Sequence, residues 1–152
     1  MKVLYFHSKG STSYSNNVNL GNILYHKQYH YWRSFMNWAA LEKWQWCENA
    51  LNTHDIAGGD YVMDPLPHFR GNFWWARSNH IRQLPDPLDK SVWYNFQQKT
   101  VNQTIKSFPV RMYDEFWICV RDGYTAYDIV DLKDKNPSID ILSKLDCERS
   151  LK

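Results

Sequence analysis

Apolar positions recur with two different spacings along the chain, which predict both strands and helices. Short apolar runs rich in β-formers predict strands at residues 2–6, 55–62 and 72–76, and an edge strand over residues 124–132. Because a helical pattern separates two of these runs, we expect an α/β sheet covered by helices, in which the strands beginning at Leu4, Ile56 and Phe73 are neighbours. Between residues 23 and 51, apolar side chains every three or four positions predict an amphipathic helix in one or two pieces: Trp32, Met36, Ala39, Ala40, Trp44, Cys47 and Leu51.

Polar residues and prolines mark the remaining boundaries. Residues 11–22 are rich in Ser and Asn and predict a loop. Ser78 is a suitable N-cap for a helix over residues 79–84, which the prolines at 85 and 87 end. Further helices are predicted at residues 90–107 and near 111–118. We expect one domain over residues 1–132, followed by a terminal helix or tail over 133–152.

The composition excludes several classes of protein. Eighteen basic and 16 acidic side chains give a formal charge of +2 without a basic block, which argues against nucleic-acid binding. Cys47, Cys119 and Cys147 are widely spaced, so neither a disulfide framework nor a zinc knuckle is indicated, and a reduced, cytoplasmic setting is expected. No apolar run is long enough for a membrane span, and no signal-peptide pattern is present. His26 and His30 have the spacing of paired metal ligands, but no third ligand completes the set.

The most unusual stretch runs from Pro67 to Arg77 and contains three consecutive aromatic residues, Phe73, Trp74 and Trp75. Neighbouring side chains in a strand face opposite ways, so only one of the two tryptophans can point into a single core. Two interpretations remain open. Either one indole is available to a flat ligand, or both pack, one on each side of a sheet covered on both faces.

Two further motifs place polar side chains where chemistry is expected. His7-Ser8-Lys9-Gly10 follows the first predicted strand, and ligands of open α/β sheets bind outside the carboxyl ends of strands. An ordinary polar turn is the alternative. Asp114 and Glu115 precede an apolar stretch, and adjacent residues on a helix diverge by about 100°, so at most one of them can face a shared site. The alternative here is an acid stabilised by the helix dipole.

Together, the three motifs resemble those of a family of small nucleotide-sugar glycosyltransferases with a GT-A-type fold, known from bacterial polysaccharide clusters and large algal viruses. That family carries similar His-Ser/Thr-Lys-Gly, His-Phe-Ser-Gly-Asn-Phe-Trp-Trp-Ala and Glu-Phe-Trp-Ile segments, and Arg70 stands where it usually has Ser. The resemblance implies a partial GT-A-like, Rossmann-like mixed sheet flanked by helices. It also implies transfer of a sugar from a nucleotide-sugar donor to a glycan acceptor. A non-catalytic carbohydrate-binding module is the alternative, and an interaction protein with an aromatic interface is a third.

The resemblance also implies roles for individual residues. The donor diphosphate is expected at His7 and Lys9, and the catalytic base of an inverting transfer at Glu115, with Asp114 as runner-up. The acceptor sugar is expected to contact a polar and aromatic set: Asn72, Trp74, Trp75 and His68. A lysine charge can neutralise a diphosphate directly, so no metal ligand is assigned, and manganese or magnesium is left open as a cofactor.

The nucleotide-binding half of a GT-A enzyme precedes the strand that ends at His7, and the sequence shows neither that half nor a glycine-rich phosphate motif. Three alternatives follow from this difference. The chain is a fragment of a longer transferase, or a partner chain supplies the missing half, or donor binding has been lost.

Overall fold

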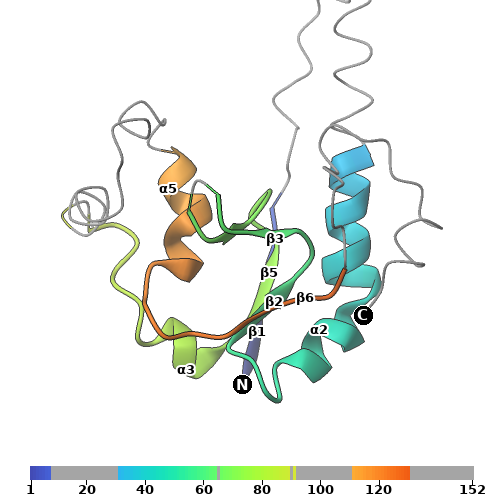
Figure 1. Cartoon of the computed structure of the whole chain (residues 1–152), viewed down its shortest axis with the longest axis horizontal. Coiled ribbons are helices and arrows are strands. Elements are labelled where there is room, and N and C mark those ends of the chain that lie inside the picture. Colours follow the sequence, from blue (N-terminus) through green and yellow to red (C-terminus); the bar gives the residue numbers. More distant parts are fainter. Residues whose placement is uncertain (8–30, 65, 90, 92–110, 131–152) are drawn as a thin grey trace, which may run out of the picture.

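A computed structural model describes residues 1–7, 31–64, 66–89, 91 and 111–130. Its centre is a four-stranded mixed sheet with the order β1-β5-β2-β6 (Figure 1). The strands are β1 (Lys2–Tyr5), β2 (Ile56–Gly58), β5 (Trp74–Arg77) and β6 (Ala126–Asp128). Strand β5 is antiparallel to β1 and to β2, whereas β6 is parallel to β2. The α/β class, the three neighbouring strands and the edge position of the last strand are therefore confirmed.

The helical segment on one face of the sheet changes its geometry partway. Residues 31–37 are helical, and a π-helix, η2 (Trp38–Glu42), and an α-helix, α2 (Trp44–Ala50), follow. In η2 the Lys43 amide donates to the Trp38 carbonyl at 2.9 Å, five residues back, so this turn holds one residue more than an α-turn. The extra residue shifts the helical phase. Trp44 is consequently 43% exposed, contrary to the prediction from the apolar spacing, while Cys47 is buried again.

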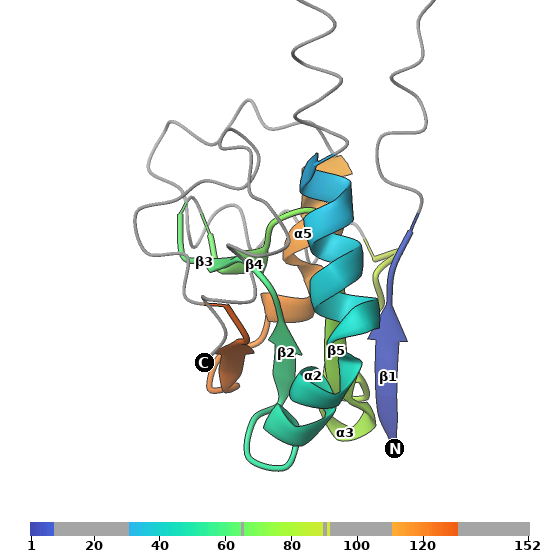
Figure 2. The ribbon, with the colours of Figure 1, turned by 90° about the vertical axis from the view of Figure 1, so that its right-hand side faces the viewer.

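Shorter helices cover the opposite face (Figure 1): α3 (Ser78–Ile81), α5 (Arg111–Phe116) and the 3₁₀-helix η4 (Trp117–Cys119). The predicted start of the first of these helices is wrong by one residue. Arg77 occupies the N-cap position, and Ser78 lies in the first turn. Figure 2 shows residues 31–42 in front of the strands, on the side away from α5. The sheet is thus enclosed between two helical layers, as expected.

The predicted strand over residues 55–62 is correct at its start and wrong in its length, because the chain turns inside it. Strand β2 ends at Gly58, and Asp60 adopts a φ of 66°, which non-glycine residues rarely do. The chain then enters a separate hairpin of β3 (Tyr61–Val62) and β4 (His68–Phe69). A Cβ on Gly58 would lie 2.9 Å from the Phe69 ring, and one on Gly59 would lie 2.8 Å from the Ala39 side chain. Close packing therefore accounts for the paired glycines.

Each face of the sheet has its own core. Trp75 packs against the cluster formed with the helical segment, which includes Phe35, Met36, Trp38, Cys47 and Leu51. Trp74 belongs to the cluster on the other face, which includes Ile56, Phe69, Ala76, Ile118 and Cys119. This arrangement is the second of the two interpretations of the tryptophan pair, with one indole on each side of the sheet.

Several sequence predictions lie outside the described residues. They concern the loop at 11–22, the helix at 90–107, the segment 133–152, and the side chains of Lys9, His26, His30 and Cys147. Within the described residues, no helix combines the length and the apolar character that crossing a bilayer requires.

Candidate functional site

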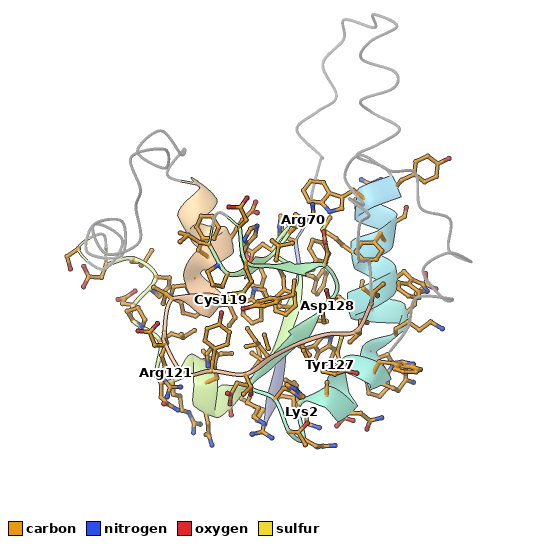
Figure 3. All side chains as sticks on the ribbon, in the orientation of Figure 1. Lys2, Arg70, Cys119, Arg121, Tyr127 and Asp128 are labelled. Atoms are coloured by element: carbon orange, nitrogen blue, oxygen red, sulfur yellow. The ribbon has the colours of Figure 1, made fainter. Side chains whose placement is uncertain are left out.

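The candidate site lies at the end of the sheet where β1 and β2 finish and β5 begins. His7 follows β1, Asp60 lies two residues beyond β2, and the turn of residues 70–72 leads into β5. Figure 3 shows Arg70 at this end, between α5 and the helical segment 31–42. Open α/β sheets bind ligands at the carboxyl ends of their strands. The topology therefore brings side chains from distant parts of the chain to the expected place.

His7 connects the first motif to the second. Its Nε2–H donates to the Gly71 carbonyl at 3.0 Å, and its ring centroid lies 5.3 Å from that of Phe73. Gly71 has a φ of 86°, and a Cβ there would lie 2.0 Å from the Met36 sulfur, so only glycine fits. Lys9, the second residue expected to bind the donor, lies outside the described residues.

Asn72 holds the indole of Trp74 in the core. The Trp74 Nε1–H donates to the Asn72 Oδ1 at 2.8 Å, and the two residues are 4% and 6% exposed. The ring of Tyr5 stacks on Trp74 with centroids 5.0 Å apart and an interplanar angle of 14°. Trp75 is half-buried, and its Nε1–H donates to the Ala40 carbonyl at 2.8 Å. Neither tryptophan thus presents an open ring to solvent. Tyr5, which stacks on Trp74, is 40% exposed, and the sequence analysis did not select it.

A buried ion pair that the sequence analysis also missed lies next to these residues. An oxygen of Asp60, which is 3% exposed, accepts from Arg70 Nη2 at 2.5 Å. Within the described part of the chain, Asp60 Oδ2 and Arg70 Nε have no hydrogen-bond partner. Burial raises the pKa of Asp60, and the Arg70 guanidinium partly opposes that shift. Two features of the sequence could have drawn attention to this ion pair: the two glycines before Asp60, and Arg70 at a position where the resembling family usually has Ser.

Asp128 fixes the backbone around this ion pair. Its carboxylate accepts the amide hydrogens of Asp60 and Tyr61, both at 3.0 Å, and that of Val130 at 3.2 Å. These hydrogen bonds connect the end of β6 to the turn after β2, and they stabilise the left-handed conformation of Asp60.

His68, which belongs to the second motif, contacts the helix that carries the third. Its Nδ1–H donates to the Leu66 carbonyl at 2.7 Å, and its ring packs edge-on against Phe116 at 4.9 Å. Burial lowers the pKa of His68, whereas the charges of Glu115 and Asp60 favour its protonated form. Glu115 is half-buried and Asp114 is exposed. Of the two adjacent acids, Glu115 is thus the more buried one, and its charge favours the protonated form of His68.

We refer to Asp60, His68, Arg70 and Glu115 as the polar cluster. It combines two carboxylates, an imidazole with a lowered pKa and a guanidinium. A carboxylate or a neutral imidazole can accept a proton from a hydroxyl group, and a guanidinium can bind anionic oxygens. Among the described residues, no group of three or more His, Cys, Asp and Glu side chains is arranged to hold a metal ion.

The fold and its site define an α/β protein with a polar cluster at the carboxyl end of a mixed sheet. The chain belongs to the family described as Domain of unknown function (DUF8361), whose model matches residues 1–122. This range contains all three motifs, from His7 to Glu115, and excludes Asp128. Searches of curated proteins and of solved structures find no match to the chain.

Proposed function

We propose that the chain carries the acceptor-binding and catalytic residues of a nucleotide-sugar glycosyltransferase in the cytoplasm. The observation that supports this proposal is the convergence of three separate motifs at one end of the sheet. His7 bonds to the carbonyl of Gly71 at 3.0 Å, and the charge of Glu115 acts on His68. Packing alone does not require polar side chains from three distant segments to meet at a strand terminus. A GT-A-like arrangement of the complete transferase is part of the proposal.

In the proposed reaction, Glu115 is the general base. Its carboxylate takes the proton of an acceptor hydroxyl while that oxygen forms a bond to the anomeric carbon of the donor. The bond from the anomeric carbon to the diphosphate breaks, and its electron pair leaves with the nucleoside diphosphate. The half-buried position of Glu115 supports this role, because partial burial limits solvation of a carboxylate without closing it off from substrate.

Binding of the donor diphosphate is assigned to His7 and Lys9, and Arg70 adds a third basic group. Guanidinium groups bind phosphate oxygens through several charge-assisted hydrogen bonds. The pairing with Asp60 fixes the orientation of Arg70, whose side chain is 23% exposed. The nucleotide itself is bound by a further segment or by a partner chain. Lys9→Met should weaken donor binding and leave acceptor binding intact, whereas strict manganese dependence with Lys9 dispensable would contradict this assignment.

Acceptor binding is assigned to the aromatic layer beside the polar cluster. Tyr5 presents its ring to solvent and rests on Trp74, which Asn72 holds in place. Aromatic rings cover the apolar face of a pyranose, and nearby polar groups then bind its hydroxyls. In this proposal Trp74 and His68 shape the acceptor site and Tyr5 supplies its exposed surface, whereas Trp75 packs on the opposite face of the sheet and supports the strand from behind.

The test is release of nucleoside diphosphate from a panel of UDP-, GDP- and dTDP-sugars, with and without neutral oligosaccharide acceptors. Glu115→Gln should lower turnover by about 10²–10⁴-fold with donor binding unchanged, as loss of a general base does. Asp114→Asn is the matched control, because Asp114 is exposed and adjacent on the same helix. If Asp114→Asn is the more damaging change, the base is Asp114. If neither change affects an active enzyme, the proposed role of Glu115 is wrong.

A non-catalytic carbohydrate-binding module is the second candidate. The exposed Tyr5 favours it, because its ring is 40% exposed and stacks on Trp74 beside the site. In that case the chain binds oligosaccharides without consuming any sugar nucleotide. Tyr5→Ala should then abolish binding, and Glu115→Gln should leave it unchanged.

A further inference from the structure

A cleft of about 320 Å³ opens between α2, the turn that follows it and β6. Three aromatic side chains and three small or polar ones line it: Trp46, His54, Tyr127, Asn49, Ala50 and Thr53. Figure 3 shows Tyr127 well below Arg70, beside α2, so the cleft is separate from the polar cluster. We propose that this cleft is a second saccharide-binding site, which takes one or two neutral sugar rings of a glycan chain.

The exposure of Trp46 is the first observation that supports this site. Cys47 in helix α2 and the C-cap residue Leu51 are both fully buried, whereas Trp46 is 42% exposed. An exposed indole adds little to the stability of the core, and exposed aromatic side chains are common at binding sites. Trp46 therefore supplies an accessible flat surface that the fold itself does not require.

The orientation of the other two rings indicates the shape of the ligand. His54 and Tyr127 lie 4.9 Å apart between centroids and are inclined by 56° to each other. Thr53 Oγ1 and the Ala50 carbonyl lie 2.9 and 3.3 Å from His54 Nδ1, which holds the ring in place. Inclined rings do not form a parallel slot for a flat nucleobase. They suit a puckered pyranose, which places its apolar face on one ring and its hydroxyls toward the rim.

The polar groups of the cleft match the hydroxyls of a neutral sugar. The Asn49 amide, the Tyr127 hydroxyl and the Trp46 indole N–H make no side-chain hydrogen bond within the described residues. Amide and hydroxyl groups can each donate and accept, as sugar hydroxyls require. Among the described residues, no Lys, Arg, Asp or Glu lines the cleft, so these residues offer no permanently charged partner to a phosphate or a carboxylate. Its volume is at the lower end of small-molecule sites, which span about 300–1,000 Å³.

The site can be tested by NMR on the whole chain, following the indole N–H signals and the backbone amide signals of Thr53 and Tyr127 during titration with maltotetraose, cellotetraose and mannotetraose. We expect the Trp46 signal to shift in a saturable way with one of these probes, at a dissociation constant near about 1 mM or below. Trp46→Ala should weaken binding at least about tenfold, and Asn49→Ala about threefold to tenfold. Trp44→Ala is the matched control, because Trp44 is 43% exposed on the same helix but does not line the cleft.

Three results would overturn the proposal: no saturable shift with any tetrasaccharide, unchanged shifts of the Thr53 and Tyr127 backbone amides in a folded Trp46→Ala variant, or a Trp46 shift with UMP and none with the sugars. The site does not depend on the proposed transferase activity. Glu115→Gln should leave the Trp46 response unchanged, so failure of either proposal can be recognised separately.

Discussion

The two faces of the central sheet contain different kinds of core. The face covered by residues 31–51 buries almost only apolar side chains, and its Cys47 thiol has a pKa raised to about 12 by burial. The face covered by α3 and α5 also buries hydrogen-bonding groups. There, His80 Nε2–H donates to the Ile118 carbonyl at 2.7 Å, and the hydroxyls of Tyr61 and Tyr124 lie 2.7 Å apart.

This difference shows where the chain retains polar groups at an energetic cost. Burying an imidazole or a carboxylate is unfavourable unless its hydrogen-bond partners are supplied, and among the described residues Asp60 Oδ2 and His80 Nδ1 have none. On the apolar face the comparable group is a neutral one, the Trp38 indole N–H. The apolar face serves stability, whereas the polar face combines stability with a candidate site. Four experiments can sharpen or contradict this division.

The largest effect is expected at Gly71, where the turn of the candidate site meets the apolar face. Gly71→Ala forces a Cβ to within 2.0 Å of the Met36 sulfur in a backbone with φ 86°. We expect it to lower the free energy of unfolding by about 3 kcal/mol or more, measured by urea denaturation. Gly123→Ala is the control, because φ is 76° and nothing lies within 4 Å. It should cost only about 1–2 kcal/mol. Equal losses would show that contact with Met36 does not matter.

The two tryptophans allow a direct comparison of the faces. Trp74→Phe removes the donor to the buried Asn72 Oδ1, while Trp75→Phe removes a donor to a helix carbonyl at the same distance of 2.8 Å. An unsatisfied buried acceptor costs about 1–3 kcal/mol, so Trp74→Phe should be the more destabilising change. Thermal and urea unfolding of both variants measure it. A larger loss for Trp75→Phe would place the critical hydrogen bond on the apolar face.

The pH dependence of stability should come mainly from the polar face. Burial lowers the pKa of folded His68, so its contribution to stability is complete above its unfolded pKa near 6.5 and is lost as the pH falls toward the folded value. The raised pKa of Asp60 acts in the opposite direction, because its contribution is complete below the unfolded value of 3.8 and is lost as the pH rises. The difference between wild type and His68→Asn isolates the histidine.

Between pH 7.5 and 5, wild type should therefore lose more unfolding free energy than His68→Asn, by up to about 1.4 kcal/mol per unit of pKa shift. Urea denaturation at several pH values measures this difference. Parallel profiles would show that His68 has the same pKa in the folded and unfolded chain.

The smallest effect is expected at Lys2, which joins β1 to α2 on the apolar face. Its ammonium donates to the Glu48 carbonyl at 2.8 Å and pairs with the Glu48 carboxylate, and both side chains are partly exposed. Lys2→Met should cost less than about 1 kcal/mol, and added salt should reduce that cost. A loss comparable to that of Trp74→Phe would mean that this ion pair is a major tie between the strand and the helix.

The fold was predictable where a regular repeat of apolar residues determines it, and it was not predictable where the backbone departs from that repeat. Met36, Ala39 and Cys47 are buried as their spacing predicted, because a helix repeats its buried face at regular intervals. Trp44 broke the pattern, since the π-turn that displaces it leaves no mark in the apolar spacing. The prediction of one strand over residues 55–62 failed at Asp60, whose amide donates a hydrogen bond to the Asp128 carboxylate that stabilises its unusual φ.

The candidate site was predictable only where local motifs carry it. His7, His68, Asn72 and Glu115 come from motifs, and the structure brings them to one end of the sheet or into its polar cluster. The roles of these residues stay predictions. Tyr5 was missed because its importance arises from its contact with Trp74, on a strand distant in sequence. The Asp60–Arg70 pair was missed because it forms only when the hairpin of β3 and β4 brings the two residues together.

The π-turn at Trp38–Glu42 also affects which changes of length the chain can accept. It accommodates one residue beyond the α-helical count, and its Leu41 is 37% exposed. Removing Leu41 would leave a regular α-turn, with the buried residues before and after it still facing the sheet. Removing Gln45 from α2 instead would rotate the preceding residues by about 100° relative to Trp46 and Cys47. Insertions and deletions among relatives should therefore collect at this turn, and the helix can vary in length while the cleft around Trp46 keeps its form.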